Sequence, residues 1–445
     1  MRIAYISAGA AGMYCGSCIH DNTLAAALQR QGHEVALIPL YTPTRTDEEN
    51  VSMDRVFFGA INVYLQTRRP WLSRLTRPIA GWLDRPGLLK KLSGLSAASS
   101  ARDLGELTVS VLHGEEGRSR EELEKLATFL HDTWQPEIIH LQNSMFLGLA
   151  RRLKEVLGVP VVCSLQGEDI FLEDLIEPYR MQALEAIHQR AVDADGLVAT
   201  SAYYADAMAR YLEIPRHRIS VVPLGLHLEG YEASEARGHL PLEAHPFTIG
   251  YLARICPEKG LHILVDAFRQ VVAAVGAAKV RLRVAGYLGG RDKAYFHALE
   301  RQIQDWGLSR QIDLVGEVDR EQKLAFLHSL DVLSVPSTYR EPKGLSVLES
   351  LAAGVPVVLP DHGAYPELVH ATGGGILVEP RSPDALASAL IPLTRDRARC
   401  HQMGQRARQI IYRDFTDSRM ADLTVAYYRQ VMADLSGSSE SGAAG

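Results

Sequence analysis

The sequence predicts an α/β protein built from two doubly wound parallel-sheet domains in tandem. A chain of 445 residues is too long for one hydrophobic core and long enough for two ordinary domains. Short runs rich in β-branched residues alternate with helical patterns, which is typical of βαβ units. The alternation starts again after Pro223–Pro246, where Gly, Pro and His collect. We therefore expect an N-terminal domain over residues 1–225, a hinge over 226–245 and a C-terminal domain over 246–410.

The expected strands form two sets of six. In the first half they are Arg2–Ser7, Glu34–Pro39, Glu137–Leu141, Pro160–Leu165, Gly196–Ala199 and Ile219–Val222. In the second half they are Phe247–Leu252, Val280–Ala285, Ile312–Val315, Val332–Val335, Val355–Leu359 and Gly375–Val378. Helical patterns separate them, for example Asn22–Gln31, which Gly32 ends, and Tyr203–Leu212. A helix over residues 411–435 is expected to pack back on the N-terminal domain, and residues 436–445 are expected to form a disordered tail.

Between residues 66 and 135 the alternation breaks, and we expect a largely helical insertion there. Its part from residue 68 to 91 holds seven Arg or Lys against one Asp, 7 − 1 = +6. Trp71 and Trp82 lie on the same side of a helical pattern that Pro78 interrupts. A basic face beside tryptophan suits an anionic membrane surface. The alternative is a helical flap over a ligand cleft, with the tryptophans packed on the first domain.

Composition narrows the class of protein. The content of 47% hydrophobic and 22% charged residues is that of a soluble globular chain, and the net charge of −6 favours no nucleic-acid partner. There is no apolar run of about 18 residues and no signal-peptide pattern at Met1. Five scattered cysteines do not indicate a disulfide framework. We expect a cytoplasmic enzyme, at the inner face of the membrane if residues 68–91 bind lipid.

The densest chemical signal is the segment Val335–Pro356. A buried strand ends at Pro336, a polar loop follows, and a helix begins near Gly344. The peptide N–H groups of Lys343, Gly344 and Leu345 would lie at the N-terminus of that helix, which suits a phosphate.

Two carboxylates accompany this helix. Glu341 lies in the loop before it and Glu349 on its second turn, so both would face the crevice at the carboxyl ends of the strands. Each carboxylate can accept two hydroxyls, as a nucleotide sugar would offer. The alternative is that Glu341 caps the helix and Glu349 is an exposed helix residue.

A second segment, Gly250–Gly260, places two cations at the same edge of the same sheet. Arg254 and Lys259 lie in the loop after the first strand of the second domain, just before a helix. Arg offers a planar fork of donors and Lys a point charge, the two usual partners of a diphosphate. We interpret them as a diphosphate clamp; the alternative is that they are ordinary surface charges.

These segments resemble the retaining glycosyltransferases of family 4, or group 1, which have the GT-B fold of two Rossmann-like domains facing each other across a cleft. The resemblance rests on Glu341 and Glu349 spaced as Glu-x7-Glu, on Arg254 with Lys259, and on the run that continues from Glu341 to Val358. Further matching segments are Pro366-Glu367 after Gly363, Gly32-His-Glu-Val, and Val222-Pro-Leu-Gly225. The likeness therefore covers nearly the whole chain.

The resemblance implies roles for these residues. Glu341 would hold hydroxyls of the donor sugar, Glu349 the ribose, and Arg254 with Lys259 the diphosphate. Gly16, counted back from Leu24-Ala25, would be the first-domain glycine that contacts the diphosphate. Lys343 stands where many members have an aromatic residue, which leaves the choice of sugar open.

The residues expected near the acceptor differ from those of many family members. Members often place His near the acceptor, whereas Gln142 and Gln166 stand at those positions here, with Asp169 close by and His20 on the first helix. We carry these four residues as candidate acceptor contacts; His20 is equally consistent with a packed or capping histidine. No protein base is then evident. In the retaining mechanism the donor's own phosphate oxygen can take the acceptor proton, while the clamped cations stabilise the departing diphosphate.

Two further motifs are discounted. Asp193-Ala-Asp195 spells the Asp-x-Asp of metal-dependent transferases, but it falls where a helix closes before a strand, and we interpret it as a solvated helix end. Cys15-Gly-Ser-Cys18 has redox or zinc spacing without a second ligand pair, so two small residues flanking a phosphate-binding Gly16 are the simpler account. We therefore expect no metal and no cofactor.

The leading hypothesis is transfer of a hexosyl group, with retention, from a nucleoside diphosphate sugar to a saccharide or a saccharide-bearing lipid, as in polysaccharide biosynthesis. Two alternatives are a nucleotide-sugar 2-epimerase, which shares the two-domain architecture, and a non-catalytic sugar-nucleotide sensor, to which the absent histidines point.

Overall fold

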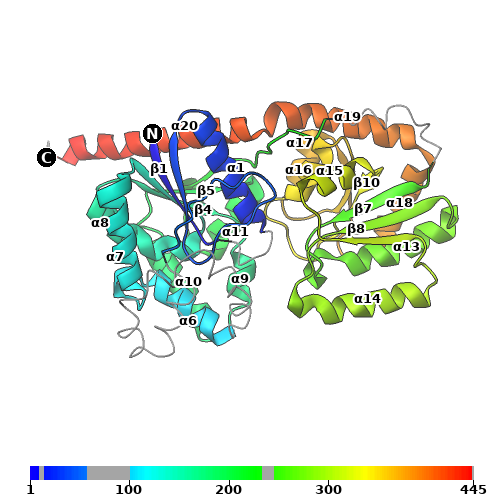
Figure 1. The fold of residues 1–445 in the computed structure, drawn as a ribbon, viewed down its shortest axis with the longest axis horizontal. Coiled ribbons are helices and arrows are strands. Elements are labelled where there is room, and N and C mark those ends of the chain that lie inside the picture. Colours follow the sequence, from blue (N-terminus) through cyan, green and yellow to red (C-terminus); the bar gives the residue numbers. More distant parts are fainter. Residues whose placement is uncertain (10–14, 58–100, 233–244, 443–445) are drawn as a thin grey trace. The chain divides into compact units, whose positions relative to one another are not determined.

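The computed structural model describes residues 1–9, 15–57, 101–232 and 245–442 (Figure 1). The chain forms two compact units. Unit 1 comprises Met1–Gly225 together with the C-terminal segment from Asp417, and unit 2 comprises Leu226–Thr416. The basic segment 68–91 lies outside the described residues.

Unit 1 contains a six-stranded parallel sheet in the order β2-β1-β3-β4-β5-β6. Its strands are β1 (Arg2–Ser7), β2 (Glu34–Pro39), β3 (Ile138–Leu141), β4 (Val161–Leu165), β5 (Gly196–Ala199) and β6 (Ile219–Val221). Its α-helices are α1 (Gly16–Arg30), α6 (Ala101–Leu112), α7 (Arg120–Phe129), α8 (Ala150–Leu157), α9 (Asp169–Glu173), α10 (Tyr179–Arg190), α11 (Ala202–Tyr211) and α20 (Asp417–Gly442). The β-branched and aliphatic residues of β1 are buried on both faces, as expected of a strand inside a doubly wound sheet.

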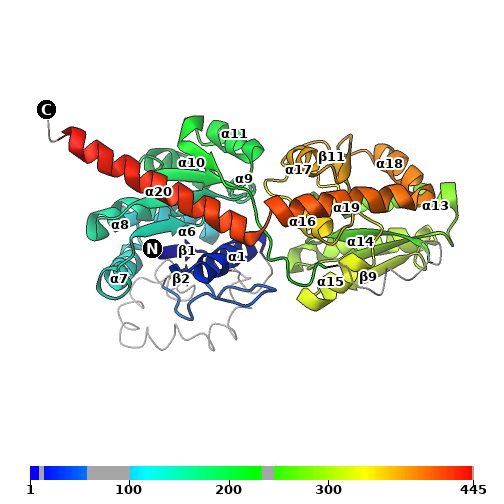
Figure 2. The same cartoon turned by 90° about the horizontal axis from the view of Figure 1, so that it is seen from above.

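The two faces of this sheet have separate cores. Ile3 and Tyr5 of β1 point to the face that α1 and α20 cover, whereas Ala4 and Ile6 point to the face that helices α6, α7, α8, α10 and α11 cover. This split follows from the alternation of side chains along a strand. Figures 1 and 2 both show α20 lying alongside α1.

The C-terminal helix belongs to unit 1. Asp417, its first residue, pairs with Arg30 at the end of α1. Tyr428 is fully buried, and its hydroxyl lies 2.5 Å from Nδ1 of His140 on β3. The helix runs on to Gly442, whereas the sequence predicts a disordered tail from residue 436. A helix that is already nucleated and packed extends at little cost per residue, which explains the difference.

Unit 2 repeats the architecture with the sheet order β12-β11-β10-β7-β8-β9, all parallel. Its strands are β7 (Phe247–Leu252), β8 (Val280–Ala285), β9 (Ile312–Gly316), β10 (Val332–Leu333), β11 (Val357–Pro360) and β12 (Gly375–Val378). Its α-helices are α13 (Leu261–Val275), α14 (Lys293–Asp305), α15 (Arg320–His328), α16 (Leu345–Ala352), α17 (Tyr365–Thr372), α18 (Pro383–Arg395) and α19 (Arg397–Asp414). The expected strands are therefore all present, with ends that differ by one or two residues.

One local feature differs from the expectations, and two others agree with them. Helix α1 begins at Gly16 rather than Asn22, so it is longer at its N-terminus than the helical pattern Asn22–Gln31 indicated. The insertion is helical over its described part, residues 101–134. In the ranges that the structure describes, no helix is both long and apolar enough to cross a membrane.

Candidate donor site

Strand topology brings the predicted cations and the first carboxylate together. Strands β7 and β10 pair side by side in parallel. Arg254 and Lys259 follow β7, and Glu341 follows β10, so all three leave the sheet at its carboxyl edge, where ligands bind in open α/β sheets. The two loops are joined directly, because the N–H of Thr338 donates to the carbonyl of Glu258 at 2.8 Å.

Lys259, Tyr339 and Glu341 form one hydrogen-bonded cluster. The ammonium of Lys259 donates to Oε2 of Glu341 at 2.5 Å and to the hydroxyl of Tyr339 at 2.5 Å. That hydroxyl also donates to the same carboxylate oxygen at 2.8 Å. Burial raises the pKa of Glu341, but the charge of Lys259 and the hydrogen bonds from Lys259 and Tyr339 bring it below the ordinary value. The carboxylate is therefore ionised although Glu341 is 8% exposed.

The turn that carries Lys259 requires a glycine after it. Gly260 has a φ of 71°, and a Cβ placed on it would lie 1.9 Å from the carbonyl oxygen of Pro336. Only glycine permits both the left-handed backbone and this close approach. Gly260 thereby seats the Lys259 turn against the loop that leads to Glu341.

Arg254 lies in the same loop and is partly buried. Its Nε donates to Sγ of Cys256 at 3.4 Å. The hydroxyl of Tyr251 donates to the carbonyl of Arg254 at 3.1 Å and so ties the start of the loop to β7. Arg254 and Lys259 thus put two cations into one loop beside Glu341.

Helix α16 begins as the sequence predicts. Its N-cap is Gly344, with a φ of 75° and no side-chain cap, so Glu341 does not cap this helix. Lys343 is buried, and its charge also favours the ionised form of Glu341. Leu345 is the first helical residue. The three residues predicted to offer peptide N–H groups therefore surround the N-terminus of α16.

Glu349 is 6% exposed, so the alternative of an exposed helix residue is wrong. Its Oε1 pairs with the ammonium of Lys323 on α15 and accepts from the hydroxyl of Tyr231 at 3.4 Å. Sequence reasoning did not single out Lys323, Tyr231 or Tyr339. For Lys323 a signal existed: it shares the buried face of α15 with Phe326 and Leu327, where a lysine needs a partner.

On unit 1, the candidate acceptor glutamines converge on a residue that sequence reasoning missed. Asp21 on α1 is fully buried and accepts from the hydroxyl of Tyr5 at 2.7 Å and from Nε2 of Gln166 at 2.8 Å. Nε2 of Gln142 also donates to it, and Nδ1 of His20 lies 3.0 Å away. Burial raises the pKa of Asp21, but these partners bring it below its ordinary value.

These contacts occupy the glutamine amides. Gln142 donates to Asp21 and accepts from the N–H of Ala8 at 2.7 Å, so its side chain joins three segments of unit 1. Asp169, at the start of α9, accepts from the hydroxyl of Tyr204 at 2.7 Å, and burial raises its pKa. Gly16 is the first residue of α1, and among the described residues outside its own turn no atom lies within 4 Å of a Cβ added to it.

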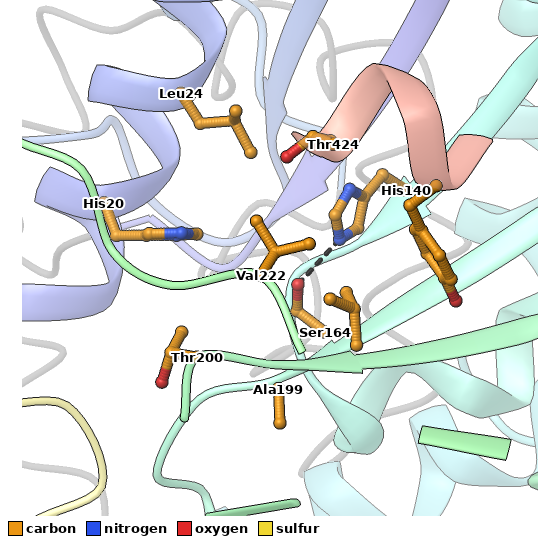
Figure 3. A pocket seen from close by; sticks show the side chains of 10 residues that line it. His20, Leu24, His140, Ser164, Ala199, Thr200, Val222 and Thr424 are labelled. Carbon is orange, nitrogen blue, oxygen red and sulfur yellow. Dashed lines mark hydrogen bonds between the residues drawn. The ribbon is translucent and has the colours of Figure 1, made fainter. Parts of the chain in front are cut away.

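His20 borders a small cavity in unit 1 together with Ser164, Thr200 and Val222 (Figure 3). The cavity volume of about 10 Å³ has room for about one water molecule. A sugar does not fit there. His20 is 6% exposed, which agrees with a packed histidine oriented by Asp21.

The Asp-x-Asp segment is not a solvated helix end. Asp195 accepts from the ammonium of Lys154 at 2.6 Å and from the N–H of Val161 at 2.8 Å, and its side chain is 7% exposed. Asp193 pairs with Arg151 at 3.3 Å. Asp195 therefore anchors the start of β4, whereas Asp193 pairs with a side chain of α8. In the described part of the chain, no group of three His, Cys, Asp or Glu residues is placed to hold a metal ion.

Two family models match the chain one after the other. Residues 22–225 match the glycosyl transferase 4-like domain, and residues 233–410 match glycosyl transferases group 1. This chain is a group 1 glycosyltransferase. It is similar to the D-inositol 3-phosphate glycosyltransferase of Segniliparus rotundus, with 26% identity over 309 residues, 68% of each chain. It is also similar to a glycogen synthase of Mycobacterium tuberculosis, with 25% identity over 308 residues, 69% of this chain and 71% of that protein.

Solved structures of glycosyltransferases share the GT-B fold. The sucrose-phosphate synthase of Thermosynechococcus elongatus superposes with a TM-score of 0.71 at 19% identity, over 97% of this chain and 99% of that chain. HepE of Anabaena in complex with UDP-glucose superposes with a TM-score of 0.64 at 19% identity, over 98% and 99%. In this group 1 glycosyltransferase, both six-stranded sheets are parallel, as that fold requires.

Proposed function

We propose that this glycosyltransferase moves a hexosyl group, with retention of configuration, from a nucleoside diphosphate sugar to a saccharide or lipid-linked saccharide. The observation that carries the proposal is the Lys259–Tyr339–Glu341 cluster, which lies in the loops beside Arg254 and the N-terminus of α16. A pair of cations next to an ionised carboxylate matches a donor that joins a diphosphate to a sugar with hydroxyl groups.

Each residue has a role in this proposal. Glu341 accepts hydroxyls of the donor sugar, and Glu349 accepts those of the ribose. Arg254 and Lys259 neutralise the diphosphate; the ammonium of Lys259 has three donors and serves Glu341 and a phosphate oxygen together. Gly16 and the first N–H groups of α16 approach the phosphates.

The reaction breaks the bond between the anomeric carbon and the phosphate oxygen, and a bond to the acceptor oxygen forms on the same face. The acceptor proton passes to the departing phosphate oxygen, so no protein base is needed. The cations stabilise the negative charge that develops on the leaving diphosphate.

A donor panel tests the proposal, and UDP-glucose is the first candidate because HepE was solved with it. A true donor at a hundred times its dissociation constant stabilises the protein by about 2.7 kcal/mol. Thermal shift therefore identifies the sugar nucleotide. Incubation without acceptor then separates the alternatives: slow hydrolysis supports a transferase, an epimeric sugar nucleotide supports an isomerase, and an unchanged ligand supports a sensor.

We also propose peripheral membrane contact through residues 68–91, which would bring a cytoplasmic enzyme to a lipid-linked acceptor. The support is the net charge of this segment in the sequence. Binding to anionic vesicles should weaken as salt rises and fade when Arg68, Arg69, Arg74 and Arg77 become Gln. A protein that stays in the supernatant with anionic vesicles at low salt would contradict it and favour the flap.

A further inference from the structure

Two cysteines lie in contact where helix α1 begins. Cys15 is the N-cap residue, and its carbonyl accepts the N–H of Ile19 at 3.0 Å. Cys18 lies in the first turn, and its thiol is hydrogen-bonded to that of Cys15. The side chains of an N-cap residue and of the third helical residue lie close together, as in a capping box. A disulfide requires Cα atoms about 4.4–6.8 Å apart, a separation that one helical turn supplies.

The two thiols differ in access to solvent. Cys15 is partly exposed, whereas Cys18 is 1% exposed and also contacts Gln142. The hydrogen bond with Cys15 and burial raise the pKa of Cys18. Cys15 is thus the thiol that an external reagent reaches first, and Cys18 is held behind it.

A metal does not explain the pair. Among the residues that the structure describes, neither Cys15 nor Cys18 belongs to a group of three potential metal ligands. The remaining cysteines are buried at separate places: Cys163 on β4, Cys256 after β7 and Cys400 on α19.

We propose that Cys15 and Cys18 are a redox-sensitive pair that closes into a reversible disulfide. The oxidant is a low-molecular-weight disulfide such as glutathione disulfide. The Cys15 thiolate attacks one sulfur of the oxidant, which forms a mixed disulfide and releases one thiolate. Cys18 gives its proton to solvent and attacks the Cys15 sulfur, which expels the second thiolate. Two protein thiols are oxidised while one external disulfide is reduced, so atoms and electrons balance.

Closure has a consequence for ligand binding, because Gly16 lies between the two cysteines. A Cβ added at Gly16 would have space around it, with no atom of the described residues outside its own turn within 4 Å. A covalent bond between Cys15 and Cys18 restrains the peptide groups on either side of Gly16. Under the proposed function, in which Gly16 contacts the diphosphate, the oxidised form binds the donor more weakly. This consequence rests on that function; the disulfide itself does not.

The test counts thiols in the full chain after equilibration with glutathione disulfide, acid quenching and maleimide labelling in denaturant. The reduced protein has five cysteines and should take five labels; the oxidised protein should take 5 − 2 = 3. Peptide mapping should find Cys15 and Cys18 joined with two hydrogens lost, and dithiothreitol should restore five labels.

Single-residue variants identify which cysteines form the disulfide. Cys15→Ser should abolish it, and because Cys15 is partly exposed this variant should keep its fold, which circular dichroism checks. Cys18→Ser should stop at the mixed disulfide on Cys15. Cys400→Ala, remote from α1 in sequence, should still form the bond. Five labels after oxidation, a mixed disulfide as the end product in the wild type, or a bond to another cysteine would overturn the proposal.

A second arm separates the two proposals. UDP-glucose binding is measured by thermal shift on reduced and oxidised protein, with Cys15→Ser as the variant that should show no difference. If the disulfide forms but the reduced and oxidised proteins bind UDP-glucose equally well, the proposed weakening of donor binding through Gly16 is wrong. If the reduced protein binds no sugar nucleotide, the proposed function fails, while the thiol count still decides the disulfide.

Discussion

Both units bury a carboxylate at the carboxyl edge of a parallel sheet, but the two carboxylates have different partners. Asp21 in unit 1 is surrounded by Tyr5, His20, Gln142 and Gln166. Glu341 in unit 2 is held by the ammonium of Lys259 and the hydroxyl of Tyr339. A carboxylate has about four lone-pair sites, so the partners of Asp21 are enough to satisfy it.

Under the proposed function, this difference separates a structural cluster in unit 1 from a ligand site in unit 2. The Asp21 cluster joins β1, α1 and the segments after β3 and β4, and its donors are used within the unit. The Glu341 cluster contains a cation, and a cation attracts an anionic ligand while it remains hydrogen-bonded to the carboxylate. The charge of the neighbouring side chains therefore distinguishes the two buried carboxylates, Asp21 and Glu341.

The distinction between the Asp21 cluster and the Glu341 cluster would be wrong if turnover did not need the cations of unit 2. Arg254→Ala and Lys259→Ala should each lower turnover about a hundredfold, equivalent to about 2.7 kcal/mol of transition-state stabilisation. Steady-state kinetics with the identified donor measure this. Lys279→Ala, an exposed lysine of the same unit, is the control and should be unaffected. Near-normal rates in folded Arg254 and Lys259 variants would remove the diphosphate clamp.

The two carboxylates of unit 2 should differ from each other. Glu341→Gln should lower turnover more than Glu349→Gln, because contact with the reacting sugar strengthens in the transition state, whereas a ribose contact contributes mostly uniform binding. For Glu349→Gln we expect KM to rise about tenfold, or about 1.4 kcal/mol, at nearly unchanged kcat. Glu321→Gln, on an exposed position of α15, is the control. A Glu349 variant that loses turnover while the Glu341 variant loses only affinity would reverse the two roles.

In unit 1, we expect the buried polar groups to affect the free energy of unfolding rather than turnover. Burial lowers the pKa of His140 to about 3, and its ring bonds Tyr428 and Ser164. Between the ordinary histidine pKa and about 3, the unfolded chain binds one proton more than the folded chain. His140 therefore makes stability fall as pH is lowered through this window, by up to about 1.4 kcal/mol per pH unit.

His140→Asn should remove that contribution to the pH dependence, whatever the variant's absolute stability. Urea unfolding of wild type and variant between pH 4 and 7 measures the difference in slope. His131→Asn, whose side chain is 61% exposed, controls for the loss of a histidine. Parallel slopes for wild type and His140→Asn would show that His140 titrates normally.

The smallest effect is expected from chelation. EDTA should leave turnover unchanged, because Asp193 and Asp195 are engaged by Arg151, Lys154 and the backbone, and the cations for the diphosphate come from side chains. An assay with and without magnesium or manganese decides this. Strict dependence on either ion would contradict this prediction and would mean that a metal ion takes part in neutralising the diphosphate.

The sequence by itself determined the two α/β units and the segment after β10. Periodic burial of β-branched residues is a local property, so the strands could be predicted to within one or two residues at their ends. Gly344 before an apolar helix also predicted the N-terminus of α16. Because parallel strands end at a common edge, Arg254, Lys259 and Glu341 could be assigned to one side of the sheet before the structure was known.

Only the tertiary structure decided which partner each buried charge has. Asp21 meets Gln142 and Gln166, and Glu349 meets Lys323, across separations in sequence that no local pattern spans. The strand order sets these neighbours, and the packing of the helices on the sheets brings the partners of these carboxylates within hydrogen-bonding distance. Desolvation makes such pairing obligatory, but it does not say which of several distant residues supplies the partner. That choice depends on geometry, which exists only after the helices have packed on the sheets.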